Sequence, residues 1–102
     1  MKRILFLATI LFMNSSFGEE TYLSGKMTNI TSYAGGLMVM LDTGVPTNCT
    51  GTPYGWLLIP EENKTMVSVA LMLWASGNKN VTVYTNGYTP GTYCVINQFD
   101  PA

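Results

Sequence analysis

The sequence has no histidine, only two cysteines and few charged residues of either sign. A structural zinc site takes about four ligands, mostly cysteine and histidine, so an ordinary zinc site is excluded. Without histidine, acid–base catalysis at neutral pH would have to use carboxylates. The pair Glu61-Glu62 precedes a predicted helix, where negative charge is favourable anyway, and Asp42 falls in a turn. We therefore expect no enzyme activity, no cofactor and no metal.

Positive charge is scarce outside the first three residues. Beyond Lys2 and Arg3 the chain carries three lysines and no arginine against six acidic residues, a net charge of −3. A protein that binds nucleic acid needs clustered cations to displace the counterions of the phosphates. Neither nucleic acid nor an anionic membrane surface is therefore an expected partner.

The N-terminus has the pattern of a secretory signal peptide over residues 1–18. A basic start, an apolar core and small residues at the cleavage positions follow one another: Lys2, Arg3, Ile4–Met13, Ser16 and Gly18. The apolar core is shorter than the about 20 residues that a permanent membrane span requires. We expect cleavage after Gly18, export to the bacterial periplasm or the medium, and one domain over residues 19–102 with no membrane span.

The two cysteines predict one disulfide, Cys49–Cys94, because exported domains of this size are often cross-linked. The bond would close a loop of about 45 residues and stabilise the domain by about 4 kcal/mol in the chain-entropy model. A pair of buried free thiols is the alternative.

The longest apolar run outside the signal lies in NKTMVSVALMLWASGNKNVTVY, residues 63–84. Asn63 or Thr65 can cap a helix there, and Gly77-Asn78 can end it. Such a helix is far shorter than the about 20 residues of a membrane span.

The apolar residues of this helix cover an arc of roughly 200°, whereas a helix that faces one core shows a stripe nearer 100°. The arc consists of Val69, Leu73, Met66, Ala70, Trp74, Val67 and Leu71. Either the helix inserts deeply into a small barrel, or Val67, Leu71 and Trp74 contact a neighbouring subunit.

Alternating and β-branched residues predict five strands. They cover Tyr22–Tyr33 with a bulge at Gly25, Leu37–Leu41, Tyr54–Ile59 ended by Pro60, Asn80–Thr85 and Thr92–Asn97. The resulting order, β-β-β-α-β-β, is that of an OB-fold, a five-stranded barrel with its helix after the third strand. A small helix-capped sandwich would show the same order.

Two short motifs stand at the start of the first predicted strand and at the end of the helix. The first is Tyr22-Leu23-Ser24-Gly25, and the second is Trp74-Ala75-Ser76-Gly77 followed by Val81-Thr82-Val83. In these two places the chain resembles the B subunits of subtilase-cytotoxin-type toxins and related small exported proteins.

The resemblance implies an OB-type fold, a ring of five subunits with the helices lining the centre, and binding of host-cell glycans. A serine in the first-strand motif contacts sialic acid in those B subunits, and Ser24 stands at that position. Lys26 is the basic residue placed to meet a sialic acid carboxylate. The toxin loops that complete the sugar site have no clear counterpart here.

Aromatic faces and short polar side chains are also suited to carbohydrate, whose C–H surface packs on rings and whose hydroxyls form hydrogen bonds. Most tyrosines fall in predicted strands, where they are common in any case. Tyr88 lies in a predicted turn, where packing does not require it. We select Ser24, Tyr54 and Tyr88 as candidate glycan-binding residues.

Two functions remain open at this point. The first is a non-catalytic, ring-forming domain that binds glycans, as toxin B subunits do. The second is a monomeric periplasmic protein that binds or inhibits another protein through a loop face.

Overall fold

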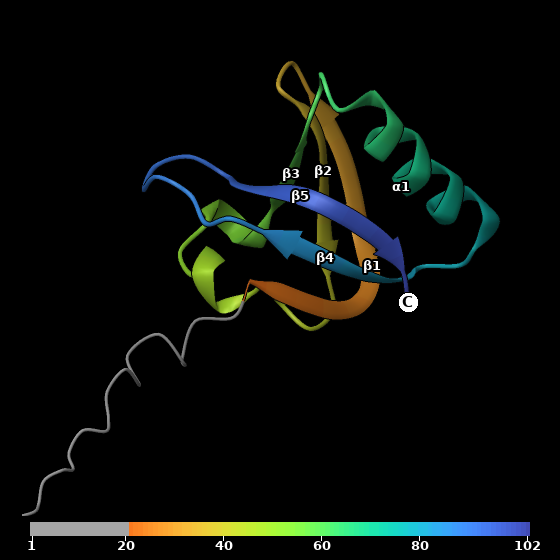
Figure 1. Ribbon diagram of the computed structural model, residues 1–102, viewed down its shortest axis with the longest axis horizontal. Coiled ribbons are helices and arrows are strands. Elements are labelled where there is room, and N and C mark those ends of the chain that lie inside the picture. The colour runs from red at the N-terminus through yellow and green to blue at the C-terminus, as the bar shows by residue number, and fades with distance from the viewer. Residues whose placement is uncertain (1–20) are drawn as a thin grey trace, which may run out of the picture.

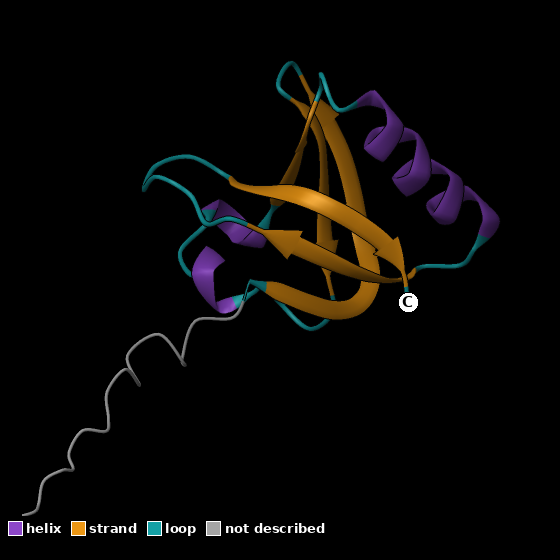
Figure 2. Cartoon of the chain, viewed as in Figure 1, coloured by secondary structure: helices purple, strands orange, loops and turns teal. Residues whose placement is uncertain are grey.

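The domain consists of five strands and one α-helix (Figure 1 and Figure 2). The computed structural model describes residues 21–102, so the predicted signal peptide lies outside the described residues. The elements are β1 (Tyr22–Tyr33), β2 (Gly36–Leu41), β3 (Leu57–Pro60), α1 (Lys64–Ser76), β4 (Asn80–Thr85) and β5 (Cys94–Pro101). A mainly β domain with its helix between the third and fourth strands is confirmed. The order differs from the predicted one by two short 3₁₀-helices between β2 and β3, η3 (Thr47–Cys49) and η4 (Pro53–Gly55).

The strands are hydrogen-bonded in the order β1-β2-β3-β5-β4, and β4 pairs back onto β1, so the sheet closes into a barrel. Neighbouring strands are antiparallel except β3 and β5, which are parallel. Strand β1 pairs twice: residues 22–26 pair with β4, and its later residues pair with β2. Figure 1 shows β1 curving around the barrel as it passes from one partner to the other.

The irregularity in β1 lies between Met27 and Asn29, so the predicted bulge at Gly25 is wrong. Gly25 has a different role, because a Cβ added there would collide with the side-chain hydroxyl of Thr43. That hydroxyl donates a hydrogen bond to the carbonyl oxygen of Ser24 at 3.0 Å. The glycine therefore permits a close approach between β1 and the turn after β2.

The seam between β3 and β5 is the shortest in the barrel, with two residue pairs, Leu57 with Cys94 and Leu58 with Val95. The Cys49–Cys94 disulfide adjoins this seam, with both cysteines fully buried and their Cα atoms 5.5 Å apart. The predicted disulfide is confirmed. Buried Thr52 adds two hydrogen bonds, because its hydroxyl accepts from the backbone N–H of Cys94 at 3.0 Å and donates to the carbonyl of Trp56 at 2.9 Å.

The inward sides of the strands form the core. In β4, Val81, Val83 and Thr85 are buried and alternate with the partly exposed Thr82 and Tyr84, as expected for a strand with one buried face. Besides the two cysteines, the core contains Met27, Leu37, Val39, Leu41, Leu57, Ile59, Ala70, Leu73, Val81, Val83, Ile96 and Phe99.

The third and the last strand differ most from the predicted ones, whereas the second begins one residue earlier, at Gly36, and the last begins two residues later, at Cys94. The third strand begins at Leu57, not at Tyr54, because Pro53 opens a 3₁₀ turn in which Tyr54 has a left-handed φ of 57°. The last strand continues to Pro101, because its second half pairs with β4 along a ladder that includes Tyr84 with Gln98.

Helix α1 packs against β5 and β3. Asn63 is its N-cap but makes no side-chain capping hydrogen bond, whereas Gly77, with φ of 85°, ends the helix as predicted. Only Ala70 and Leu73 of the helix are fully buried, so α1 lies against the barrel and is not deeply inserted in it. Within residues 21–102, no helix is both long enough and apolar enough to cross a membrane.

Removal of the Cys49–Cys94 bond should strongly destabilise the domain. The bond closes a loop with a sequence separation of 45, and the chain-entropy model assigns such a loop about 4 kcal/mol. Guanidinium unfolding of the Cys49→Ala/Cys94→Ala variant, and of the wild type with and without reductant, measures the loss. Equal unfolding midpoints for the oxidised and reduced wild type would contradict the prediction.

Candidate binding surfaces

Ser24 lies on the outer side of β1 and is exposed. Its hydroxyl shares a hydrogen bond with the hydroxyl of Thr82 on β4, with 2.7 Å between the two oxygens. Both residues face outward, because the alternate residues Val81 and Val83 are buried in the core. Ser24 also lines a shallow hollow with Lys26 and other residues. The predicted serine is therefore available to a ligand.

The strand register places Ser24 within a larger outward face formed by β1, β4 and β5. One cross-strand row contains Tyr22, Tyr84 and Gln98, and the next contains Ser24, Thr82 and Asp100. The rings of Tyr22 and Tyr84 lie side by side, with centroids 6.1 Å apart and planes tilted by 33°. We call these six residues the tyrosine face. Of these six residues, only Ser24 is among the binding residues predicted from the sequence.

Tyr88 has a structural role that the sequence did not indicate. Its ring packs against the core, and its hydroxyl donates a hydrogen bond to the carbonyl of Thr50 at 2.6 Å. The residue therefore joins the β4–β5 loop to the segment after η3. It is half-buried, so only part of its ring is available to a ligand.

Tyr54 is the most exposed large hydrophobic residue in the part of the chain that the structure describes, at 86%. It is also the only non-glycine residue among residues 21–102 with positive φ. A side chain in the left-handed region costs about 1–2 kcal/mol, and such strain is concentrated at functional sites. The 3₁₀ turn that contains Tyr54 and the β4–β5 loop that contains Tyr88 lie at one end of the barrel in Figure 1, whereas Ser24 lies on strand β1.

The three residues predicted to contact a neighbouring subunit differ in their exposure to solvent. Leu71 is 46% exposed, whereas Val67 and Trp74 are half-buried and pack against the core. The ammonium group of Lys79 lies 4.2 Å from the centroid of the Trp74 ring, a cation–π contact that covers part of the indole. Leu71 is therefore the most accessible of the three.

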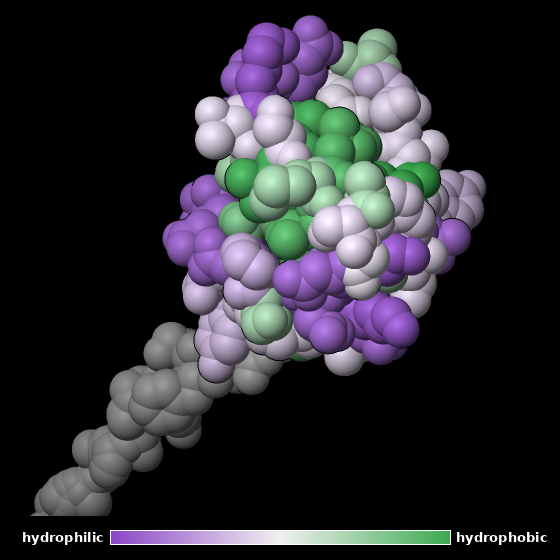
Figure 3. Space-filling view, turned by 90° about the vertical axis from the view of Figure 1, so that its right-hand side faces the viewer, coloured by the Kyte–Doolittle hydropathy of each residue, from purple (hydrophilic) through white to green (hydrophobic). Residues whose placement is uncertain are grey.

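The outer face of α1 carries one charge, Lys64 at its first position, and no charged residue after it. The exposed residues beyond Lys64 are Thr65, Ser68, Leu71, Met72, Ala75 and Ser76. Met72, which is not among the residues predicted from the sequence, is 60% exposed. Figure 3 views the side of the molecule that carries α1, and its centre is an apolar area with a polar rim. Leu71 and Val67 also line a groove of about 540 Å³ beside Tyr33 and Leu37, and the charged residues Glu61 and Lys64 line the same groove.

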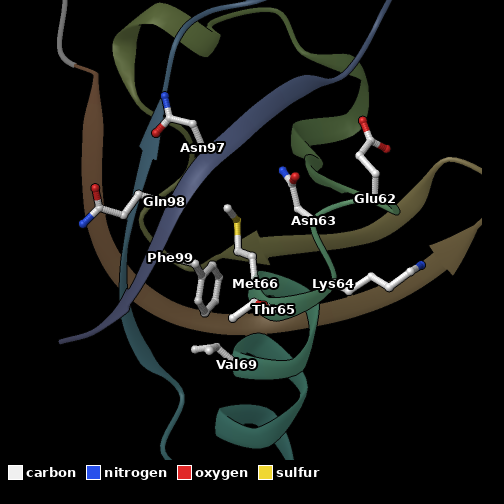
Figure 4. A pocket seen from close by; sticks show the side chains of 9 residues that line it. All are labelled: Glu62, Asn63, Lys64, Thr65, Met66, Val69, Asn97, Gln98 and Phe99. Carbon is white, nitrogen blue, oxygen red and sulfur yellow. The ribbon is translucent and has the colours of Figure 1, made fainter.

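A second hollow, of about 510 Å³, lies between the start of α1 and β5 (Figure 4). Phe99 turns toward Met66 and Val69 there, while Gln98 extends to the other side of β5, toward the tyrosine face. Over residues 21–102, no three cysteine, aspartate or glutamate side chains are grouped to hold a metal ion.

Substitutions of Tyr88 and Tyr54 should differ in their effect on stability, because only the Tyr88 variant should lower it. Tyr88→Phe removes the hydrogen bond to Thr50 and should cost about 0.5–1.5 kcal/mol. Tyr54→Gly relieves the left-handed backbone, so the free energy of unfolding should stay constant or rise by up to about 1 kcal/mol. Urea unfolding measures both. If Tyr54→Gly lowered the free energy of unfolding by more than Tyr88→Phe does, the prediction would be wrong and the Tyr54 side chain would be needed for the fold.

Comparison of the chain with models of protein families, with curated proteins and with solved structures found no match in any of the three.

Proposed function

We propose that the protein is an exported, non-catalytic binding domain of OB-fold type that associates with copies of itself through α1 and binds glycans. The strand order β1-β2-β3-β5-β4, closed onto β1 and with its helix between β3 and β4, supports the OB-fold assignment. The buried disulfide supports export, because such bonds persist in oxidising compartments.

The outer face of α1 beyond Lys64 carries the proposal, because it has no charged residue. A helix exposed to water on one side normally presents charged and polar residues there. In α1, Leu71 and Met72 are exposed and the residues between them on the surface are small, namely Ser68 and Ala75. Small residues allow a second backbone to approach closely, and the larger apolar pair supplies surface to bury. The resemblance to toxin B subunits supports a ring of five.

Glycan binding draws its support from the accessible hydroxyl of Ser24 and from the surrounding outward face. Ser24 and Thr82 together offer hydroxyls that can donate and accept hydrogen bonds, as a sugar requires. Two tyrosine rings lie in the adjacent row. Such a combination of rings and convergent polar groups is typical of small-ligand sites.

Self-association should depend on Leu71. Leu71→Glu places a charge at the centre of the proposed contact and should convert the oligomer to monomer at micromolar concentration, because a buried unpaired charge is strongly unfavourable. Gel filtration with native mass spectrometry measures the state.

The matched control is Thr89→Glu, which adds the same charge in the β4–β5 loop, on the other side of the barrel from α1 in Figure 1. It should leave the oligomer intact. A wild type that is monomeric at these concentrations would overturn the ring and favour the second function, a monomeric periplasmic protein that binds or inhibits another protein.

Glycan binding should depend on Ser24. On a glycan array the wild type should bind a restricted set of structures, and Ser24→Ala should reduce that signal because a hydroxyl partner is lost. Undiminished binding by Ser24→Ala, with the fold intact by circular dichroism, would remove this residue from the site.

A further inference from the structure

We infer that the tyrosine face is the glycan site and that it takes an uncharged saccharide, which stacks on Tyr22 and Tyr84 and hydrogen-bonds to Asp100. The inference rests on the proposed glycan-binding function and specifies where that binding occurs and which class of sugar is selected.

The two rings provide the stacking surface. Tyr22 is 51% exposed, and its ring lies 6.1 Å from that of Tyr84, tilted by 33°. Both side chains project from paired strand positions, Tyr22 opposite Tyr84, so the barrel backbone fixes their spacing. The weakly positive C–H bonds on one side of a sugar ring can pack against the negative faces of aromatic rings. Together the rings form a broader apolar surface than one exposed tyrosine does.

Hydrogen bonds among the polar side chains beside the rings fix their positions. The side-chain amide nitrogen of Gln98 donates to the Asp100 carboxylate, at 3.1 and 3.4 Å from its two oxygens. A carboxylate has about four acceptor positions, so sugar hydroxyls can still donate to it. The Ser24 and Thr82 hydroxyls share their own hydrogen bond, at 2.7 Å. Groups ordered in advance lose less entropy when a ligand binds.

The distribution of charge favours an uncharged sugar. Asp100 is paired with Thr82 in the ladder and is therefore separated from Ser24 by one strand, β4, on the same face. A carboxylate in this position accepts hydrogen bonds from hydroxyls but repels a sugar acid. Such repulsion would act on the carboxylate of sialic acid, the ligand that the family resemblance suggests.

The three lysines of residues 21–102 do little to offset this repulsion. Lys79 lies over Trp74, and the ammonium group of Lys64 donates to the backbone carbonyl of Glu61 at the start of α1. Lys26 lines the hollow beside Ser24, but Asp42 lines the same hollow and Asp100 lies on the tyrosine face, so two carboxylates outnumber this one ammonium group.

The tyrosine face and the outer face of α1 are compatible with each other. Tyr22 opens β1 and Tyr84 lies near the end of β4, on the side of the barrel away from α1 in Figure 1. Contact between copies through α1 would leave the rings free. Several copies could then present equivalent sites to a surface that carries many sugars.

The test compares matched pairs of glycans that end either in galactose or glucose or in sialic acid, first on an array and then as soluble oligosaccharides by calorimetry. Soluble ligands remove the contribution of multivalency. The wild type should prefer the uncharged members. Tyr22→Ala should weaken binding by about tenfold or more, and Tyr22→Phe should retain it, because the ring is the contact surface.

Tyr93→Ala is the matched control. Tyr93 is a half-buried tyrosine directly before β5, and its ring lies 6.0 Å from that of Tyr33, outside the tyrosine face. The Tyr93→Ala variant should bind the soluble sugars as the wild type does. Asp100→Asn should narrow the preference for uncharged over sialylated glycans, because it removes the repulsive charge while keeping an acceptor.

The outcomes separate the inference from the proposed function. Preference for sialylated glycans, or wild-type affinity in Tyr22→Ala, overturns the inference and leaves glycan binding in place. A wild type that binds no glycan on the array overturns both. Melting temperatures of all variants are measured alongside, and loss of binding in Tyr22→Ala with retention in Tyr22→Phe supports the inference even if the alanine variant is less stable.

Discussion

Closure of the barrel at the β3–β5 seam is the constraint on which the rest of the structure depends. The ladder there has only two residue pairs, so backbone hydrogen bonds alone hold it weakly. The Cys49–Cys94 bond and the two hydrogen bonds of Thr52 meet at the same point. They fix the start of β5, and β5 in turn aligns with β4 and carries Gln98 and Asp100 onto the outer face. A covalent link buried in the core thus determines the geometry of an exposed surface.

The two surfaces of interest depend on different parts of the fold. The tyrosine face is a product of strand register, since its members come from three strands and meet only when the barrel is closed. The outer face of α1 comes from one segment, so its apolar composition does not depend on how the strands pair. A helix that buries only Ala70 and Leu73 completely, and that has no charge after Lys64 on its outer side, leaves apolar area unpaired in the single chain.

Features with local causes could be predicted from the sequence, and features with long-range causes could not. Gly77 ends α1 and the alternation of Val81 and Val83 defines β4, because both depend on neighbouring residues. The meeting of Tyr22 with Tyr84 depends on a register between strands far apart in the sequence. Met72 lay outside the predicted apolar arc, and its exposure depends on which side of the helix the barrel covers. The left-handed backbone at Tyr54 likewise depends on how the segment after η3 reaches the seam.

The double pairing of β1 also affects how the chain reaches its native state. Pairing with β2 is local, whereas pairing with β4 must await residues synthesised much later, and contacts of that range form slowly. Until then β1 and β4 have open edges, to which strands of other molecules can add. Formation of the disulfide joins the segment before β3 to β5, so the chain has fewer conformations to sample before β5 pairs. The supply of oxidant during folding should therefore influence the balance between correct folding and aggregation.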